Sequence, residues 1–510
     1  MTRMSGLQNL SNELLKEILD HVDADPEQCV SIDRRAYLSV ESFRPPSPPL
    51  PSRAQDIGNF RLVCQRFSES GAPYQFTRIA TRFSISGFKR LEKIANRNYL
   101  AKHTRKFSYL VPLFYVEDRQ NIRDILRSAP VGLRDLDPTN FEAKAQDQTT
   151  LVRTREDLRV LKMAMTAFTS LQHVQILRLQ DESDRQLLDF LQEGEGDGAR
   201  AIDSRWTPAC FHATKTMGEA LMHARSPFSR FSGPMMNCQS ALAIRQSIPK
   251  TVPVLSSRLT CLELHFDDGL DLDEKMRAMS NLFHTVFSAA KNLQALHIGF
   301  PSHTPLGLGL EEVFHNVQWE KLRAFGIQSW RLSAEEIISL ARRHSRTLRG
   351  LRLRDVLLKD GSMWKDVLAM LREEMELLDW VSLRRVDYAK QFDDLWRNSM
   401  EVPDDPPGGA SDSDDEDNFS TRFSMSGQDD NSEAEDSDYQ SNADTDNGPE
   451  ANDIALSPDT PLSLPFCTCS RSSYPATADD LGDNGQYVNY QQRKMWEKWV
   501  VGRCPEHSPS

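Results

Sequence analysis

Hydrophobic residues near the start of the chain recur at helical spacing. They lie three or four positions apart, with charged residues such as Lys16 and Glu17 between them, which predicts an amphipathic helix. Ser11 or Asn12 can cap its first turn. A second apolar group follows about forty residues later and predicts another apolar helical stripe. The two sets are Leu10, Leu14, Leu15, Ile18 and Leu19, and then Leu62, Val63, Cys64 and Phe67.

Farther along, a leucine-x-x-leucine-x-leucine pattern repeats with a nearly constant period. Five copies start between 26 and 34 residues apart, at Leu259, Leu293, Leu322, Leu348 and Leu378. Earlier copies start at Val174 and, in degenerate form, at Thr104. This period is typical of leucine-rich repeats, in which a short strand buries alternate residues and a return segment covers them.

The segments between the copies carry apolar residues at helical spacing, so we expect a helix after each strand. These helices are expected over 272–290, 310–317, 334–343 and 363–371. Ser333 with Glu336 forms a capping box before the third. The pattern therefore predicts an α/β solenoid, although a series of strand–helix units in an open α/β sheet would also produce it. The span from Gln180 to Arg258 is irregular and is expected to contain a loop at 194–198.

The N-terminal pattern resembles the F-box. Leu10-Ser11-Asn12-Glu13-Leu14-Leu15 is similar to the opening leucine-proline-x-glutamate-leucine-leucine of that family, and Leu62-Val63-Cys64-Gln65-Arg66-Phe67 is similar to part of its later helix. Ser11 replaces the usual proline but supplies a capping side chain. A proline-rich stretch, residues 24–56, is interpreted as an insertion. An ordinary amphipathic helix pair within a larger helical core is the alternative.

Later segments resemble fungal F-box proteins with leucine-rich repeats, through Trp319-x-x-Leu322-Arg323, 332–336, 348–353 and 360–364. The resemblance implies a non-catalytic substrate receptor of a Skp-cullin-F-box ubiquitin ligase. The F-box would bind a Skp-type adaptor, and through it a cullin, while the repeats would bind an unknown protein substrate. The adaptor-binding residues would then be Leu10, Leu14, Leu15, Ile18, Leu19, Leu62, Val63, Cys64 and Phe67.

Charge divides the chain into a mildly basic body and an acidic tail. Residues 401–460 contain nineteen acidic residues and one basic residue, although the whole chain has a net charge of −13. Such a segment has too little apolar area to order itself and is expected to be disordered.

These patterns together predict an α/β protein with four parts. They are a helical F-box at residues 1–80, a leucine-rich-repeat solenoid at 81–395, an acidic disordered segment at 396–465 and a tail at 466–510 containing a short helix around Trp496 and Trp499.

Composition and motifs argue against several functions. The chain has no run of apolar residues long enough to span a membrane and no signal-peptide core, so we expect a cytoplasmic or nuclear protein. Scattered cysteines favour reduced thiols. Nucleophile-elbow and phosphate-loop motifs are missing, so we expect neither enzymatic activity nor a cofactor. Nucleic-acid binding is weakly supported. Four residues could form a zinc site or remain free in a flexible tail: Cys467, Cys469, Cys504 and His507.

Strand alternation selects a candidate substrate-binding surface on the concave face. Its residues are Arg178, His265, His297, Gln328, Arg352, Arg354 and Arg384, with Gln180, Glu263 and Ser382 beside them. We expect Leu351 and Leu353 to be buried and the arginines to be exposed. The acidic residues 412–417 could rest against these arginines or could only keep the protein soluble. A scaffold protein without a ubiquitin role remains the alternative function.

Overall fold

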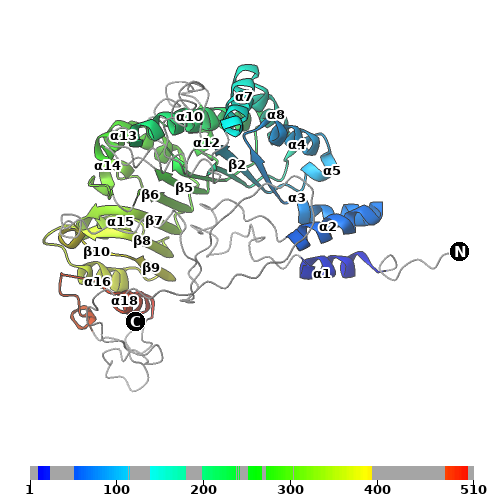
Figure 1. Ribbon diagram of the computed structural model, residues 1–510. Helices are drawn as coiled ribbons and strands as arrows, with labels where there is room; N and C mark the ends of the chain where they lie inside the picture. The colour runs from blue at the N-terminus through cyan, green and yellow to red at the C-terminus, as the bar shows by residue number, and fades with distance from the viewer. Residues whose placement is uncertain are drawn as a thin grey trace, which may run out of the picture.

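One parallel β-sheet runs through the protein (Figure 1). The computed structural model describes residues 10–22, 51–112, 114, 138–179, 198–236, 238, 241, 251–266, 271–301, 304–392 and 477–502. Within these residues the sheet has ten strands, which pair in chain order from β1 to β8, with β9 and β10 both pairing with β8. The strands are β1 (Arg78–Arg82), β2 (Lys106–Pro112), β3 (His173–Leu179), β4 (Arg230–Met236), β5 (Cys261–Phe266), β6 (Ala295–Gly299), β7 (Ala324–Leu332), β8 (Gly350–Leu358), β9 (Trp380–Arg384) and β10 (Asp387–Tyr388).

Helices precede the sheet and connect its strands. Along the sheet the larger connecting helices lie on the outer side, as Figure 1 shows for α8, α10, α13, α15 and α16. The helices are α1 (Asn12–Val22), α2 (Pro51–Val63), α3 (Gln65–Phe76), α4 (Ile85–Ala95), α5 (Asn98–Ala101), α7 (Pro138–Thr154), α8 (Glu156–Ala167), α10 (Gly198–Ala224), α12 (Thr251–Ser256), α13 (Leu272–Ala289), α14 (Leu310–Phe314), α15 (Ala334–Arg343), α16 (Trp364–Glu374), the 3-10 helix η5 (Ala478–Leu481) and α18 (Tyr490–Val501).

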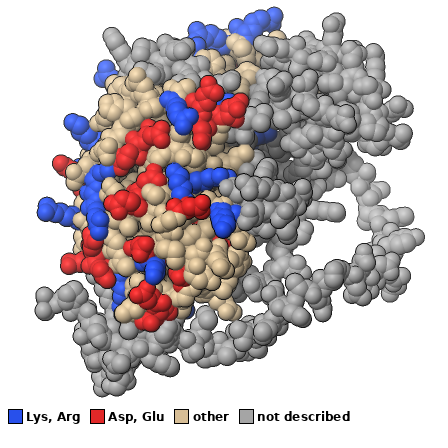
Figure 2. Space-filling model, turned by 90° about the vertical axis from the view of Figure 1, so that its left-hand side faces the viewer, with Lys and Arg blue, Asp and Glu red and all other residues tan. Residues whose placement is uncertain are grey.

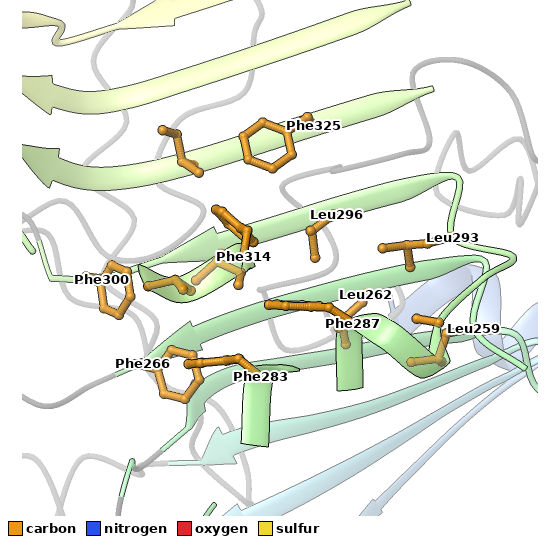
Figure 3. Packing of buried hydrophobic residues seen from close by; sticks show 14 of the residues in the cluster. Leu259, Leu262, Phe266, Phe283, Phe287, Leu293, Leu296, Phe300, Phe314 and Phe325 are labelled. Carbon is orange, nitrogen blue, oxygen red and sulfur yellow. The ribbon is translucent and has the colours of Figure 1, made fainter. Parts of the chain in front are cut away.

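The main hydrophobic core lies between these helices and one face of the sheet. Leu296, Phe325, Leu351 and Val381 are register neighbours on successive strands, and all four belong to this core. Figure 3 shows aromatic side chains from strands and helices filling the same layer, including Phe314, which lies 5.4 Å from Phe325 between ring centres. The predicted burial of these apolar positions is therefore confirmed, but burial does not alternate along β6 and β8, because both faces of these strands are covered.

The expected fold class is wrong. The described residues form an α/β arrangement in which a single parallel sheet is interleaved with helices, rather than a helical F-box followed by a leucine-rich-repeat solenoid. β1 begins at Arg78, directly after α3, and α3 contacts α5, so the first helices continue into the sheet. The connections are also unequal, since α10 alone has 27 residues. The leucine pattern misled because any parallel strand covered by helices buries the same positions.

The span with the irregular pattern contains regular elements, and the loop expected at 194–198 lies outside the described residues except for Gly198, which begins α10. Its described part contains α10, β4 and α12, and β4 pairs with β3 and β5. The acidic segment, most of the proline-rich stretch and the four candidate zinc ligands lie outside the described residues. The disorder of the acidic segment, its contact with the arginines and the zinc site therefore stay predictions.

Helix α15 shows how the sequence fixes an element locally. The Ser333 hydroxyl accepts from the amide of Glu336, and the Glu336 carboxylate accepts from the amide of Ser333, so the predicted capping box is confirmed. Ile337, Ile338 and Leu340 are buried on the side facing the sheet. Arg343 of this helix pairs with Glu311 of α14.

Basic and acidic side chains alternate over the side of the molecule drawn in Figure 2, which shows no large area of a single charge sign.

The C-terminal segment covers the last edge of the sheet. Helix α18 contacts β9 and α16, and Trp496, Trp499 and Val500 are buried. The amide of Leu383 in β9 donates to the carboxylate of Glu497. Exposed strand edges invite pairing with other chains, and this helix blocks that edge. The helix predicted around Trp496 and Trp499 is therefore present.

A buried histidine is predicted to make the fold pH-dependent. Burial lowers the pKa of His344 from 6.5 to about 4. The neutral ring stacks on Trp319, and its Nε2 accepts from the amide of Trp319 at 3.2 Å. Between these two pKa values the unfolded state binds more protons than the folded state. The stability that the neutral His344 contributes is therefore fully present above about pH 6.5 and is lost as the pH falls toward 4.

We therefore expect the free energy of unfolding to drop by roughly 3 kcal/mol from this residue across that window. The measurement is urea unfolding at pH 7 and pH 4.5 for the wild type and for His344→Gln. The variant should show a smaller drop. An equal drop in both proteins would show that His344 is not responsible.

Candidate functional site

The first three helices pack into a cluster whose inner residues come from the predicted adaptor-binding set. Leu15, Leu19 and Phe67 are buried, at 0%, 2% and 2% exposure. Phe60 of α2 stacks on Phe67 of α3 with ring centres 4.4 Å apart. The Ser11 hydroxyl accepts from the amide of Leu14 at 3.4 Å, as expected for a capping residue. Three of the nine predicted residues therefore hold the helices to one another.

Other residues of the same set point outward. Leu14 is 47% exposed and Ile18 is 38% exposed on α1, while Leu62 and Val63 at the end of α2 are 84% and 57% exposed. Leu10 and Cys64 are partly buried. An apolar stripe on α1 thus has two sides, and one of them is used inside the cluster. Exposed apolar side chains therefore lie on the outer side of α1 and at the end of α2.

An interruption of the helical backbone at Cys64 explains why some of these side chains face the cluster and others face solvent. Cys64 is extended, with φ −161° and ψ 167°, so α2 ends at Val63 and α3 begins at Gln65. The predicted helical stripe over residues 62–67 is therefore divided between two helices. Leu62 and Val63 end the first one, and Phe67 turns into the cluster from the second.

Polar bonds fix α1 against α3. Arg66 Nε donates to Asn12 Oδ1 at 2.9 Å, and the Tyr74 hydroxyl donates to Asp20 Oδ1 at 2.6 Å. Arg66 also donates to the carbonyl of Leu10. These contacts lie at the two ends of α1, so they set its angle and keep Leu14 and Ile18 facing outward.

A second candidate region is the sheet face opposite the main core. Buried polar residues from neighbouring strands meet there. His173 Nε2 lies 2.8 Å from Ser232 Oγ, Ser232 Oγ donates to Glu263 Oε2 at 2.5 Å, and Arg230 Nη2 donates to Glu263 Oε1 at 2.7 Å. Ser108 Oγ donates to Gln175 Oε1 on the adjacent strands.

The direction of these bonds argues against a serine nucleophile. Ser232 gives its single proton to Glu263, so its oxygen accepts from His173 Nε2 rather than passing a proton to it. Burial, together with the charges of Arg230, Lys106 and Arg78, holds the pKa of His173 well below its usual value. A catalytic serine needs the histidine to act as an acceptor for its proton. This network therefore connects strands instead of activating an oxygen.

The predicted substrate-binding residues occupy the same sheet face farther along. His265, His297, Gln328, Arg354 and Arg384 lie on five consecutive strands, β5 to β9. Gln328, Arg354 and Arg384 are direct register neighbours. Arg354 and Arg384 therefore lie side by side on this face, which also carries Lys106 and Arg230 on earlier strands.

The arginines of this group are less exposed than expected. Arg352 is 8% exposed and Arg354 is 7% exposed, so the expectation of solvent exposure is wrong, whereas Leu351 and Leu353 are buried as predicted. Burial, together with the nearby charges of Arg352 and Arg354, holds the pKa of His297 well below its usual value. His297 therefore stays neutral beside the guanidinium groups.

Arg178 is not brought to this group. Its register partner is Val111, whose side chain lies in the main core, so alternation places Arg178 on the helix-facing side at the end of β3. Conversely, sequence reasoning missed His173, Arg230 and Ser232. Ser232 and Arg230 belong to β4, which lacks the leucine spacing, and the alternation of polar Arg230 and Ser232 around Phe231 was the available signal.

The described residues contain no group of histidine, cysteine, aspartate or glutamate side chains arranged to hold a metal ion, and no described helix is long and apolar enough to cross a membrane. A scan against models of protein families finds no match for this chain, and a search of curated proteins finds no relative.

Proposed function

We propose that this chain is a non-catalytic recognition subunit of a Skp-cullin ubiquitin ligase. Its N-terminal helices bind a Skp-type adaptor, and the polar face of its sheet binds a protein substrate. The sequence resemblance of residues 10–19 and 62–67 suggests the class of partner. The observation that supports the proposal most is the exposure of four large apolar side chains on the first two helices, Leu14, Ile18, Leu62 and Val63.

These exposed apolar side chains are better suited to contact with another protein than to contact with water. Leu62 and Val63 lie side by side in sequence at the end of α2, and both are more than half exposed. α1 contacts α2 as well as α3, so the exposed side chains of α1 and α2 belong to one helix cluster. Large apolar side chains that cluster on a surface are typical of protein interfaces, whereas single exposed ones are ordinary. A helical partner surface with a complementary apolar groove would bury them.

The basic part of the sheet face suggests the kind of substrate segment. Arg352 and Arg354 lie on β8 and are almost buried, whereas Arg384, beside Arg354 on β9, is partly exposed. Gln328 lies on the other side of Arg354. Guanidinium groups favour carboxylate and phosphate partners, because their donors match two oxygens at once. An acidic or phosphorylated segment is therefore the proposed substrate feature.

The adaptor contact is tested by pull-down. We expect the double variant Leu14→Asp with Ile18→Asp to lose at least about thirtyfold in affinity for a purified Skp-type adaptor, since an interface anchor typically contributes about 2 kcal/mol or more. Because both side chains face solvent, the circular dichroism spectrum and the melting temperature should change little.

The matched control is Lys16→Asp, which adds an acidic residue to the polar side of the same helix. It should bind the adaptor like the wild type. Full binding by the double variant would sink the proposed adaptor contact. Failure of the wild-type chain to bind would favour a scaffold protein without a ubiquitin role.

A further inference from the structure

A cavity of about 180 Å³ lies between the sheet and the helices that cover its central strands. Its floor comes from β3, β4 and β5, which contribute Ile176, Phe231 and Leu264, and its roof comes from α10, α12 and α13. Protein interiors normally contain few voids larger than a water molecule. A space of this size beside the core is therefore unusual, although it is only partly enclosed.

The cavity offers little to a polar ligand. Thr214 and Ser256 are the polar side chains in its lining, and the remaining lining residues are apolar or glycine. The Thr214 hydroxyl donates to the carbonyl of Cys210 in its own helix at 2.7 Å, so its proton is already used. A buried water needs two to four polar partners. We therefore expect the lining to hold water only weakly, so that an apolar ligand can displace it.

The lining can adapt to an apolar guest. Met217 and Met279 face the cavity from two helices, and methionine fills irregular spaces readily because its side chain is flexible. Phe266 and Phe283 meet edge to face at 5.9 Å and provide ring surfaces (Figure 3). Leu264 and Phe231 are only half-buried although they lie on central strands. Apolar surface remains there for a ligand to cover.

We propose that this cavity binds a small neutral apolar molecule with the bulk of a single aromatic ring. A dry engineered cavity of roughly 150 Å³ is known to bind benzene, so the volume here suits a ligand of that size. Ions and strong hydrogen-bond donors are excluded because burying them without partners costs too much free energy. The site lies on the helix side of the sheet and does not depend on the proposed adaptor or substrate contacts.

The test compares toluene with phenol, which is similar in size but carries a hydroxyl group. Toluene at about ten times its dissociation constant should raise the melting temperature of the full chain by about 2 °C, and phenol should raise it much less. Absence of a toluene effect, or an equal effect of phenol, would overturn the proposal.

A cavity-filling variant locates the binding. Gly218 lies inside α10 and lines the cavity, so Gly218→Leu should fill part of the space and also favour the helix. Gly218→Ala should give an intermediate result if leucine proves too large. The control is Lys215→Leu, on the same helix but outside the lining. Toluene should raise the melting temperature of the control as much as that of the wild type. The dissociation constant of toluene for Gly218→Leu should be at least about fivefold higher than for the wild type. Equal binding by Gly218→Leu would place the toluene elsewhere and contradict the proposed site.

Discussion

Glu263→Ala is expected to destabilise the protein by about 3–5 kcal/mol. The Glu263 side chain is completely buried and accepts hydrogen bonds from Arg230 and from Ser232. Removing it leaves a largely buried guanidinium without this carboxylate and a hydroxyl without this acceptor. Urea unfolding followed by circular dichroism gives the free energy.

The matched control for this substitution is Glu312→Ala. Glu312 is 54% exposed and lies 3.8 Å from Arg277, which is 61% exposed. An exposed pair of this kind contributes at most about 1 kcal/mol. If both variants lost the same small amount of stability, the buried network would not hold β4 and β5 together as described.

Leu351→Ala is expected to cost about 2–5 kcal/mol, because it opens a cavity in a well-packed core. Leu351 is 1% exposed on β8, between Phe325 of β7 and Val381 of β9. The loss should appear as a lower melting temperature and a lower urea midpoint.

Arg349→Ala provides the comparison, since Arg349 precedes the same strand, is 42% exposed and pairs with Asp379 at 3.4 Å. It should change stability by less than about 1 kcal/mol. Comparable losses in the two variants would mean that the register of β8 in the core is incorrect.

The sequence predicted strand positions better than it predicted fold class. Leucine spacing marked β5 to β9 because buried apolar residues alternate along any covered strand. It could not distinguish repeats of one kind from unequal strand–helix units, and it missed β4, where Arg230 and Ser232 alternate with Phe231. The length of the connections, not the strand pattern, carries that information.

The candidate sites were predictable only in part, for a similar reason. Helical spacing placed Leu14, Leu15, Ile18 and Leu19 on one stripe, but the cluster divides that stripe between an inner and an outer side. The turn at Cys64, which no local signal marked, decides where Leu62 and Val63 point. Tertiary packing also buries Arg352 and Arg354, which alternation alone would have exposed.

The most direct test of the account is an alanine scan of the N-terminal helices, with adaptor affinity and melting temperature measured on each purified variant. The exposed set is Leu14, Ile18, Leu62 and Val63, and the buried set is Leu15, Leu19 and Phe67. The account predicts that variants of the exposed set weaken adaptor binding at an unchanged melting temperature, whereas variants of the buried set lower the melting temperature. Wild-type affinity throughout the exposed set would contradict it.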